Sequence, residues 1–147
     1  MQNRLIHESD GQRTFAVVLE TGDEVMACLE SFVRRERLSA AQFTAIGAFS
    51  DVVLKYFDWE SKRYIDNPVR EQVEVASLIG DVACGPDGAP ALHAHLVAGR
   101  RDGTALAGHL GRGHVRPTLE AIFTESPAHL RKRKDPESGL ALIRMEG

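Results

Sequence analysis

Cysteine is scarce in the sequence, aromatic residues are few, and no long apolar run occurs. The two cysteines, Cys28 and Cys84, are far apart and form no Cys-x-x-Cys pair, which excludes zinc-finger motifs and disulfide-rich scaffolds. No apolar stretch is long enough to cross a membrane, and the first ten residues lack the apolar centre of a signal peptide. We therefore expect a cytoplasmic protein with reduced thiols and no membrane partner.

The charge balance lacks an excess of cations. Eighteen lysines and arginines stand against 21 aspartates and glutamates, so the net charge is −3 at pH 7. The chain as a whole has no positive field for non-specific nucleic-acid binding, and any DNA contact has to be local. The 147 residues are 43% hydrophobic and 27% charged, as in ordinary globular proteins. The length predicts a single packed domain spanning 1–147.

One strand and one helix are predicted near the amino terminus. Residues 14–20 are rich in β-branched and apolar side chains, which indicates a buried strand. Thr21 and Glu24 have the spacing of a capping box, so the helix is expected from residue 22 to about 37. Its apolar face repeats at helical spacing through Val25, Leu29, Phe32 and Val33.

Short apolar runs separated by glycine, aspartate and proline follow the helix and predict a series of strands. Asn67-Pro68 indicates a turn or loop over residues 64–68, because Asn-Pro starts turns. Residues 126–138 are expected to form a loop or helical turn. The predicted strands are 42–46, 51–59, 69–78, 119–124 and 140–144. This order predicts an α+β fold, a mainly antiparallel β-sheet with one or two flanking helices.

Three histidines are predicted to meet on two neighbouring strands. His93 and His95 are two residues apart, so in a strand they project from the same face. The sequence 101–103 (Arg-Asp-Gly) fits a three-residue hairpin loop with glycine in the left-handed region. Counting outward from that loop places His95 opposite His109, and directly paired residues share a face. A register slip of one residue would turn His109 to the other face.

Three neutral imidazoles are typical ligands of a divalent transition metal ion, and Zn²⁺ is the best match. A fourth position would stay open for water or a substrate oxygen. The alternative is that His93, His95 and His109 are ordinary strand histidines, hydrogen-bonded on a half-buried face. His114 could add a ligand, but its loop leaves its direction open. The two other histidines, His7 and His129, are expected at the surface.

Five sequence motifs, taken together in their order along the chain, resemble the plants-and-prokaryotes-conserved (PPC) domain. In plants this domain occurs in AT-hook nuclear-localised proteins. The resemblance extends from about Phe15 to Ile143. The motifs are Phe43–Ser50 (FTAIGAFS), Glu74–Asp81 (EVASLIGD), Leu92–His95 (LHAH), Gly99–Gly103 (GRRDG) and Ala107–Leu110 (AGHL).

The resemblance implies an α+β fold, a homotrimer and a metal ion held by the histidines of this motif, which correspond to His93, His95 and His109. Where the family usually has two glycines before the third histidine, this chain has Ala107-Gly108. The family is also associated with DNA binding, because its plant members carry an AT-hook centred on Arg-Gly-Arg-Pro. This sequence has no such motif.

Basic segments are the remaining candidates for DNA contact. Arg100 and Arg101 lie at the predicted hairpin tip, and two further clusters lie at the helix end and at residues 131–134. Each of these clusters is also typical of a solvated charged face.

Three functions remain open from the sequence. The first is a metal-binding trimer with a regulatory role that contacts DNA through repeated basic loops. The second is a metal-dependent enzyme or a small-molecule binding protein that uses the open metal position, with Glu74 and Glu120 as candidate bases. The third is a structural metal at the hairpin or a subunit interface. Candidate trimer contacts are the apolar positions Val53, Tyr56 and Trp59, although a buried core position explains each of them equally well.

Overall fold

A computed structural model describes residues 1–145 of the chain, so residues 146 and 147 of the predicted domain lie outside the described part. One helix and nine strands occur in that part. They are β1 (Gln2–Ser9), β2 (Gln12–Glu20), α1 (Val25–Glu36), β3 (Ala40–Asp58), β4 (Arg63–Val69), β5 (Val73–Cys84), β6 (Pro90–Gly99), β7 (Ala105–Glu125), β8 (Lys132–Lys134) and β9 (Ala141–Ile143).

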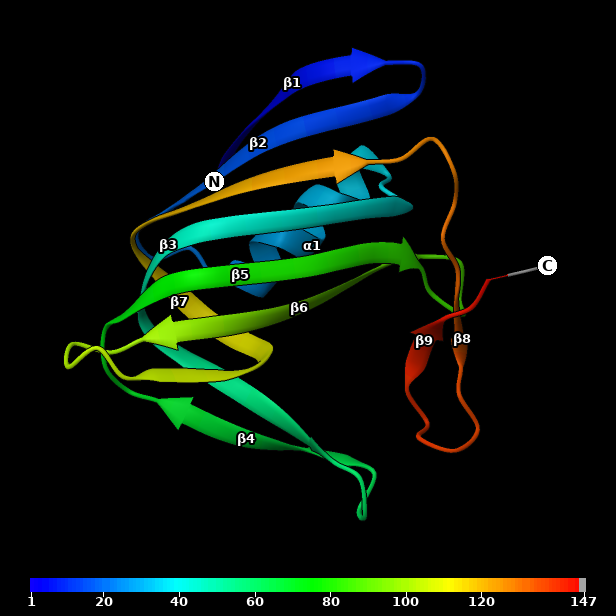
Figure 1. Ribbon diagram of the computed structural model, residues 1–147. Coiled ribbons are helices and arrows are strands. Elements are labelled where there is room, and N and C mark those ends of the chain that lie inside the picture. Colours follow the sequence, from blue (N-terminus) through cyan, green and yellow to red (C-terminus); the bar gives the residue numbers. More distant parts are fainter. Residues whose placement is uncertain (146–147) are drawn as a thin grey trace.

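The first seven strands form one antiparallel sheet in the order β1-β2-β7-β6-β5-β3-β4, and β8 pairs with β9 in a small separate hairpin. Strand β7 also pairs with β3, so β3, β5, β6 and β7 form a closed circuit of pairings. Helix α1 lies behind the sheet, and the β8–β9 hairpin stands at its side near the carboxyl terminus (Figure 1). The predicted α+β class is confirmed, with a single helix in the described residues.

Helix α1 begins later than the sequence predicts. Its N-cap is Glu24, whose carboxylate accepts hydrogen bonds from the backbone N–H groups of Met26 and Ala27. The capping box expected at Thr21 is therefore wrong, and the Thr21 hydroxyl instead donates to the carbonyl of Pro117. The glutamate side chain supplies the acceptor that the first free N–H groups of a helix need.

The predicted strand 42–46 and residues 51–58 of the predicted strand 51–59 are parts of the single long strand β3. The register shifts beside Gly47, where an added Cβ atom would lie 2.2 Å from the carbonyl oxygen of Thr118. Glycine is therefore required for the close approach of β3 to β7. The bend at this bulge lets one strand pair with several neighbours.

The turn predicted over residues 64–68 is wrong, because these residues belong to β4. Pro68 fits there because β4 is an edge strand of the sheet, where a missing N–H removes no essential ladder bond. The chain instead reverses over residues 59–62, ahead of β4. Strands β1 and β8 were not expected either, since their mostly polar sequences carry no apolar alternation.

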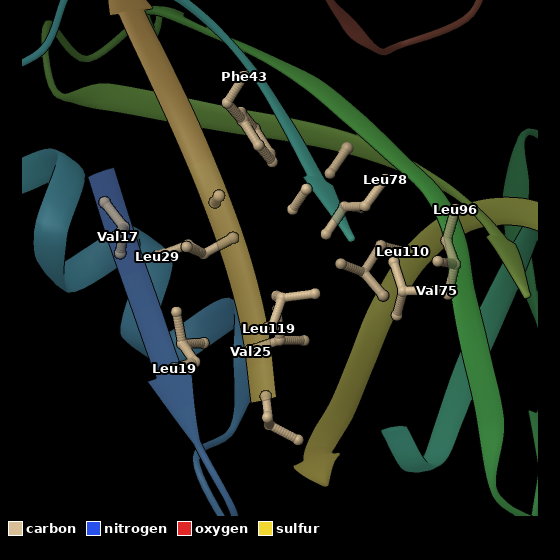
Figure 2. Packing of buried hydrophobic residues seen from close by; sticks show 14 of the residues in the cluster. Val17, Leu19, Val25, Leu29, Phe43, Val75, Leu78, Leu96, Leu110 and Leu119 are labelled. Carbon is tan, nitrogen blue, oxygen red and sulfur yellow. The ribbon is translucent and has the colours of Figure 1, made fainter. Parts of the chain in front are cut away.

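The core lies between α1 and the inner face of the sheet. Phe123 of β7 stacks on Phe43 of β3 at a ring-centroid distance of 4.4 Å and lies 5.1 Å from Phe32 of α1. Aliphatic side chains from α1, β2, β5, β6 and β7 continue this cluster (Figure 2). None of the described residues forms a helix with the length and hydropathy of a membrane span.

Candidate metal centre

The β6–β7 hairpin has the predicted loop and register. The N–H of Arg100 donates to the carbonyl of Thr104 at 2.8 Å, and Gly103 adopts a left-handed φ of 83°. Asp102 accepts from the N–H of Thr104 and rigidifies the tip. His95 and His109 are consequently Cα partners in the ladder, and the predicted pairing is confirmed.

The imidazoles of His93, His95 and His109 converge. Each ring offers a nitrogen, and these nitrogens all lie within 4.8 Å of one another. The Nε2 atoms of His93 and His95 are 3.2 Å apart, and the three ring-centroid distances are 5.0, 5.1 and 5.5 Å. The alternation of strand side chains and the hairpin register are together sufficient to bring these rings to one place.

His93 is held by a carboxylate that is itself held by a lysine. Its Nδ1 lies 3.1 Å from Oδ2 of Asp81, the residue opposite it on β5. The other carboxylate oxygen lies 2.7 Å from Nζ of Lys132, whose side chain is 6% exposed. Burial raises the pKa of Asp81, but the hydrogen bonds from His93 and Lys132 outweigh it and hold the pKa below its usual range. An ionised Asp81 favours the His93 tautomer that carries its proton on Nδ1, so the lone pair of Nε2 is directed toward His95.

The surroundings of His109 lower the pKa of its imidazole. Burial, with smaller effects from His93, His95 and the nearby lysines, lowers the pKa of His109 to about 4. Burial and the neighbouring His93 also lower the pKa of His95. Nδ1 of His109 is buried and has no hydrogen-bond partner among the described residues. An unpaired buried nitrogen costs free energy unless it binds something, and a metal ion would satisfy it.

The donor set fits a divalent transition metal ion. Three imidazole nitrogens converge, the His109 ring also has a buried nitrogen without a hydrogen-bond partner, and a carboxylate orients the His93 ring as in carboxylate–histidine–metal arrangements. Within residues 1–145 no fourth ligand side chain joins the group, so the site would keep an open position.

A cavity of about 630 Å³ lies beside the three histidines. Residues of three hairpins line most of this cavity. They are the β6–β7 hairpin, the β3–β4 hairpin with its aromatic residues, and the β8–β9 hairpin with its apolar residues. The ring of Tyr64 packs on His109 at 4.9 Å, and Phe57 packs on Tyr64 at 5.3 Å. A small molecule that enters this cavity would reach the histidine nitrogens.

Other candidate residues lie away from this centre. Glu74 and Glu120 line a separate pocket, so neither is placed to act as a base at the histidines. His114 pairs with Asp51 at 3.1 Å and is not part of the three-histidine group. His7 lies on the exposed strand β1, as expected for a surface residue.

The predicted DNA-contacting arginines lie at the exposed tip of the β6–β7 hairpin. Arg100 forms an ion pair with Glu71 at 2.5 Å, and Asp102 lies in the same turn. Arg101 is exposed and stands beside them. The local positive charge at this tip is therefore partly offset by acidic neighbours.

Sequence reasoning missed Asp81, Lys132 and Tyr64. Asp81 could have been found by treating the loop between Cys84 and Pro90 as a second hairpin, since those two residues pair and counting outward places Asp81 opposite His93. Lys132 and Tyr64 carried no such signal, because both reach the site through contacts between elements distant in the chain.

The chain is similar to a known domain family and to several solved structures. Residues 6–127 match the Plants and Prokaryotes Conserved (PCC) domain. A PPC protein from Pyrococcus horikoshii is 30% identical, with 92% of this chain and 93% of that chain covered and a TM-score of 0.83. A metal-containing protein from Archaeoglobus fulgidus is 30% identical, with 90% and 93% covered and a TM-score of 0.81. A protein from Ralstonia eutropha, named as a candidate DNA-binding protein, is 28% identical, with 90% and 91% covered and a TM-score of 0.80. No curated protein sequence matches the chain.

Proposed function

The chain belongs to the Plants and Prokaryotes Conserved (PCC) domain family, and on that premise we propose that it is a homotrimeric protein that binds a divalent transition metal ion through His93, His95 and His109. The observation that carries the proposal is the convergence of three imidazole nitrogens within 4.8 Å of one another. Zn²⁺ suits this set best, because all three donors are imidazole nitrogens. The relative from Archaeoglobus fulgidus is a metal-containing protein, which supports a bound metal ion in this chain.

The chain's own residues prepare the site for a cation. The low pKa of His109 keeps that imidazole unprotonated at neutral pH, so no proton has to be displaced when a metal binds. Asp81 orients His93, and Lys132 keeps Asp81 in place. A bound Zn²⁺ ion would supply a Lewis acid that polarises a carbonyl or a water molecule in the adjoining cavity.

An open site is favoured over a purely structural one. A structural zinc site normally has four protein ligands, whereas three ligand side chains converge in the described residues. The nearest carboxylate, Asp81, is already engaged by His93 and Lys132. The remaining side of the cluster borders the cavity, where an exchangeable ligand can enter.

Metal content per chain tests this proposal. Untagged protein should contain about one zinc or similar ion per chain, and His109→Ala should contain none, because two imidazoles hold such an ion weakly. His114→Ala is the matched control, since His114 is an exposed histidine outside the group. Equal metal content in the wild-type protein and His109→Ala would refute the site.

The proposed trimer would use the sheet face that α1 leaves uncovered. Thr44 of β3 pairs with Ile79 of β5 and with Ile122 of β7, which places these side chains in one row. Ile79 is 54% exposed and Ile122 is 45% exposed, and Ile46 adds a third exposed isoleucine on β3. Contiguous exposed apolar residues of this kind mark interaction surfaces.

Light scattering tests the trimer. The wild-type protein should have three times the chain mass of 16.2 kDa. Ile122→Glu should dissociate it, whereas Leu5→Glu, on the edge strand β1, should not. A monomeric wild-type mass would contradict the proposal. Of the contacts expected from the sequence, Val53 is excluded because it is buried, while Tyr56 and Trp59 are exposed.

DNA binding is a second candidate function, which the name of the Ralstonia eutropha relative favours. In a trimer the Arg101 tip would be repeated three times, and repetition raises avidity without new contacts. The affinity for duplex DNA should then fall linearly with salt on a log–log plot and weaken in Arg101→Ala. No retardation of DNA at low salt would refute this function and leave metal binding unaffected.

A further inference from the structure

The cavity beside the histidines is larger than a metal-bound water needs. Its volume of about 630 Å³ falls within the range of small-molecule sites. Its walls are mostly apolar: Phe57 and Tyr64 on one side, and Leu92, Leu140, Leu142 and Ile143 on the other. Such walls favour a ligand with a hydrocarbon part, because the ligand would cover apolar surface that is otherwise exposed to water.

The charged groups around the cavity favour an anion. Asp81 and Lys132 offset each other through their 2.7 Å ion pair. Lys55 also lines the cavity, and its distance of 3.5 Å to the exposed Asp66 makes it a weakly paired cation. The three histidines contribute no negative charge, so a divalent ion there would keep its full positive charge.

Lys55 is placed so that one ligand carboxylate could contact both its Nζ and the histidine group. Lys55 and His109 are Cα partners in the β3–β7 ladder, so their side chains leave the sheet on the same face. A carboxylate has two oxygens, and one can face the metal position while the other accepts a charge-assisted hydrogen bond from Nζ of Lys55.

We propose that this cavity binds a small monocarboxylate with an apolar tail, held by Lys55 at its head and by the β8–β9 hairpin along its tail. The proposal rests on the proposed metal-binding function, because the head of the ligand is placed against the three-histidine group. Inorganic phosphate would satisfy the charge but would leave the apolar walls unused.

Calorimetric titration of the zinc-loaded protein with hexanoate tests the proposal, with acetate, hexanol and phosphate as comparisons. Hexanoate should bind at least tenfold more tightly than acetate, because it adds four methylene groups to the same head. It should also bind at least tenfold more tightly than hexanol, which has the tail without the charge. Phosphate binding as tightly as hexanoate, or hexanoate binding no more tightly than acetate, would overturn the proposal.

Two variants test which residues bind the carboxylate head of hexanoate and which bind its apolar tail. Lys55→Met should weaken hexanoate binding about tenfold without changing metal content, whereas Lys62→Met, at the β3–β4 turn outside the cavity, should have no effect. Leu142→Asp should abolish hexanoate binding by placing a negative charge in the tail wall, and Ile6→Asp on β1 should not. Unchanged hexanoate affinity in both cavity variants would overturn the proposal.

Metal content measured on the same samples distinguishes failure of the proposed metal binding from failure of the proposed carboxylate binding. Wild-type protein that holds no metal contradicts the proposed function and removes the basis of this inference. Protein that holds metal but shows no preference for hexanoate contradicts the inference alone.

Discussion

Replacing Asp81 with Asn should weaken both the metal site and the fold. Asp81 accepts a hydrogen bond from Nδ1 of His93 and forms a 2.7 Å ion pair with Lys132. Removal of a carboxylate that orients a metal-bound histidine typically costs about 10–100-fold in metal affinity. We therefore expect Asp81→Asn to bind Zn²⁺ about 10–100-fold more weakly than the wild-type protein.

The stability loss follows from the burial of Lys132. Breaking a fully buried ion pair by removing one partner costs about 3–5 kcal/mol. Lys132 is 6% exposed but Asp81 is 30% exposed, so solvent screens part of the interaction and about 2 kcal/mol is expected for Asp81→Asn. In Lys132→Met the group left unpaired is Asp81, which is more exposed than Lys132 and can be hydrated by water. We therefore expect this variant to lose only about 1 kcal/mol of unfolding free energy.

A double-mutant cycle in urea, run with a chelator present, measures the pair without the metal. Asp81→Asn combined with Lys132→Met should be more stable than Asp81→Asn alone, since no buried charge is left unpaired. Zinc affinity should stay low in the double variant, because His93 has still lost its carboxylate. A coupling free energy below about 0.5 kcal/mol, or wild-type zinc affinity in Asp81→Asn, would refute this account of the site.

Further expectations concern the core and two glycines. Phe123→Ala should lower the unfolding free energy by about 3–5 kcal/mol in urea titrations, because this fully buried ring packs against two other phenylalanines; a loss under about 1 kcal/mol would contradict that packing. Gly103→Ala should cost about 1 kcal/mol through its left-handed φ alone, with metal content unchanged, since no atom lies within 4 Å of the added methyl group. Gly47→Ala should lower the unfolding free energy by roughly 3 kcal/mol, because the methyl group added at residue 47 would overlap the backbone of Thr118. Equal losses of unfolding free energy in Gly47→Ala and Gly103→Ala would contradict this overlap.

The features of this protein that follow from short-range rules could be predicted from the sequence. The two-residue period of a strand put His93 and His95 on one face, and the three-residue loop with Gly103 in the left-handed region set the register that brings His109 opposite His95. The apolar period of α1 identified its buried face, although Glu24 rather than Thr21 caps the helix.

The residues that surround the histidines could not be predicted, because they come from elements distant in the chain. Lys132 meets Asp81 because a short strand late in the chain returns to the edge of the β5–β6 hairpin, and no local pattern encodes that return. Tyr64 packs on His109 because residues expected to form a turn instead extend as an edge strand, where Pro68 is tolerated. Pairings between distant strands depend on burial of the whole core. The residues that line the cavity and their charges therefore could not be predicted from local sequence patterns.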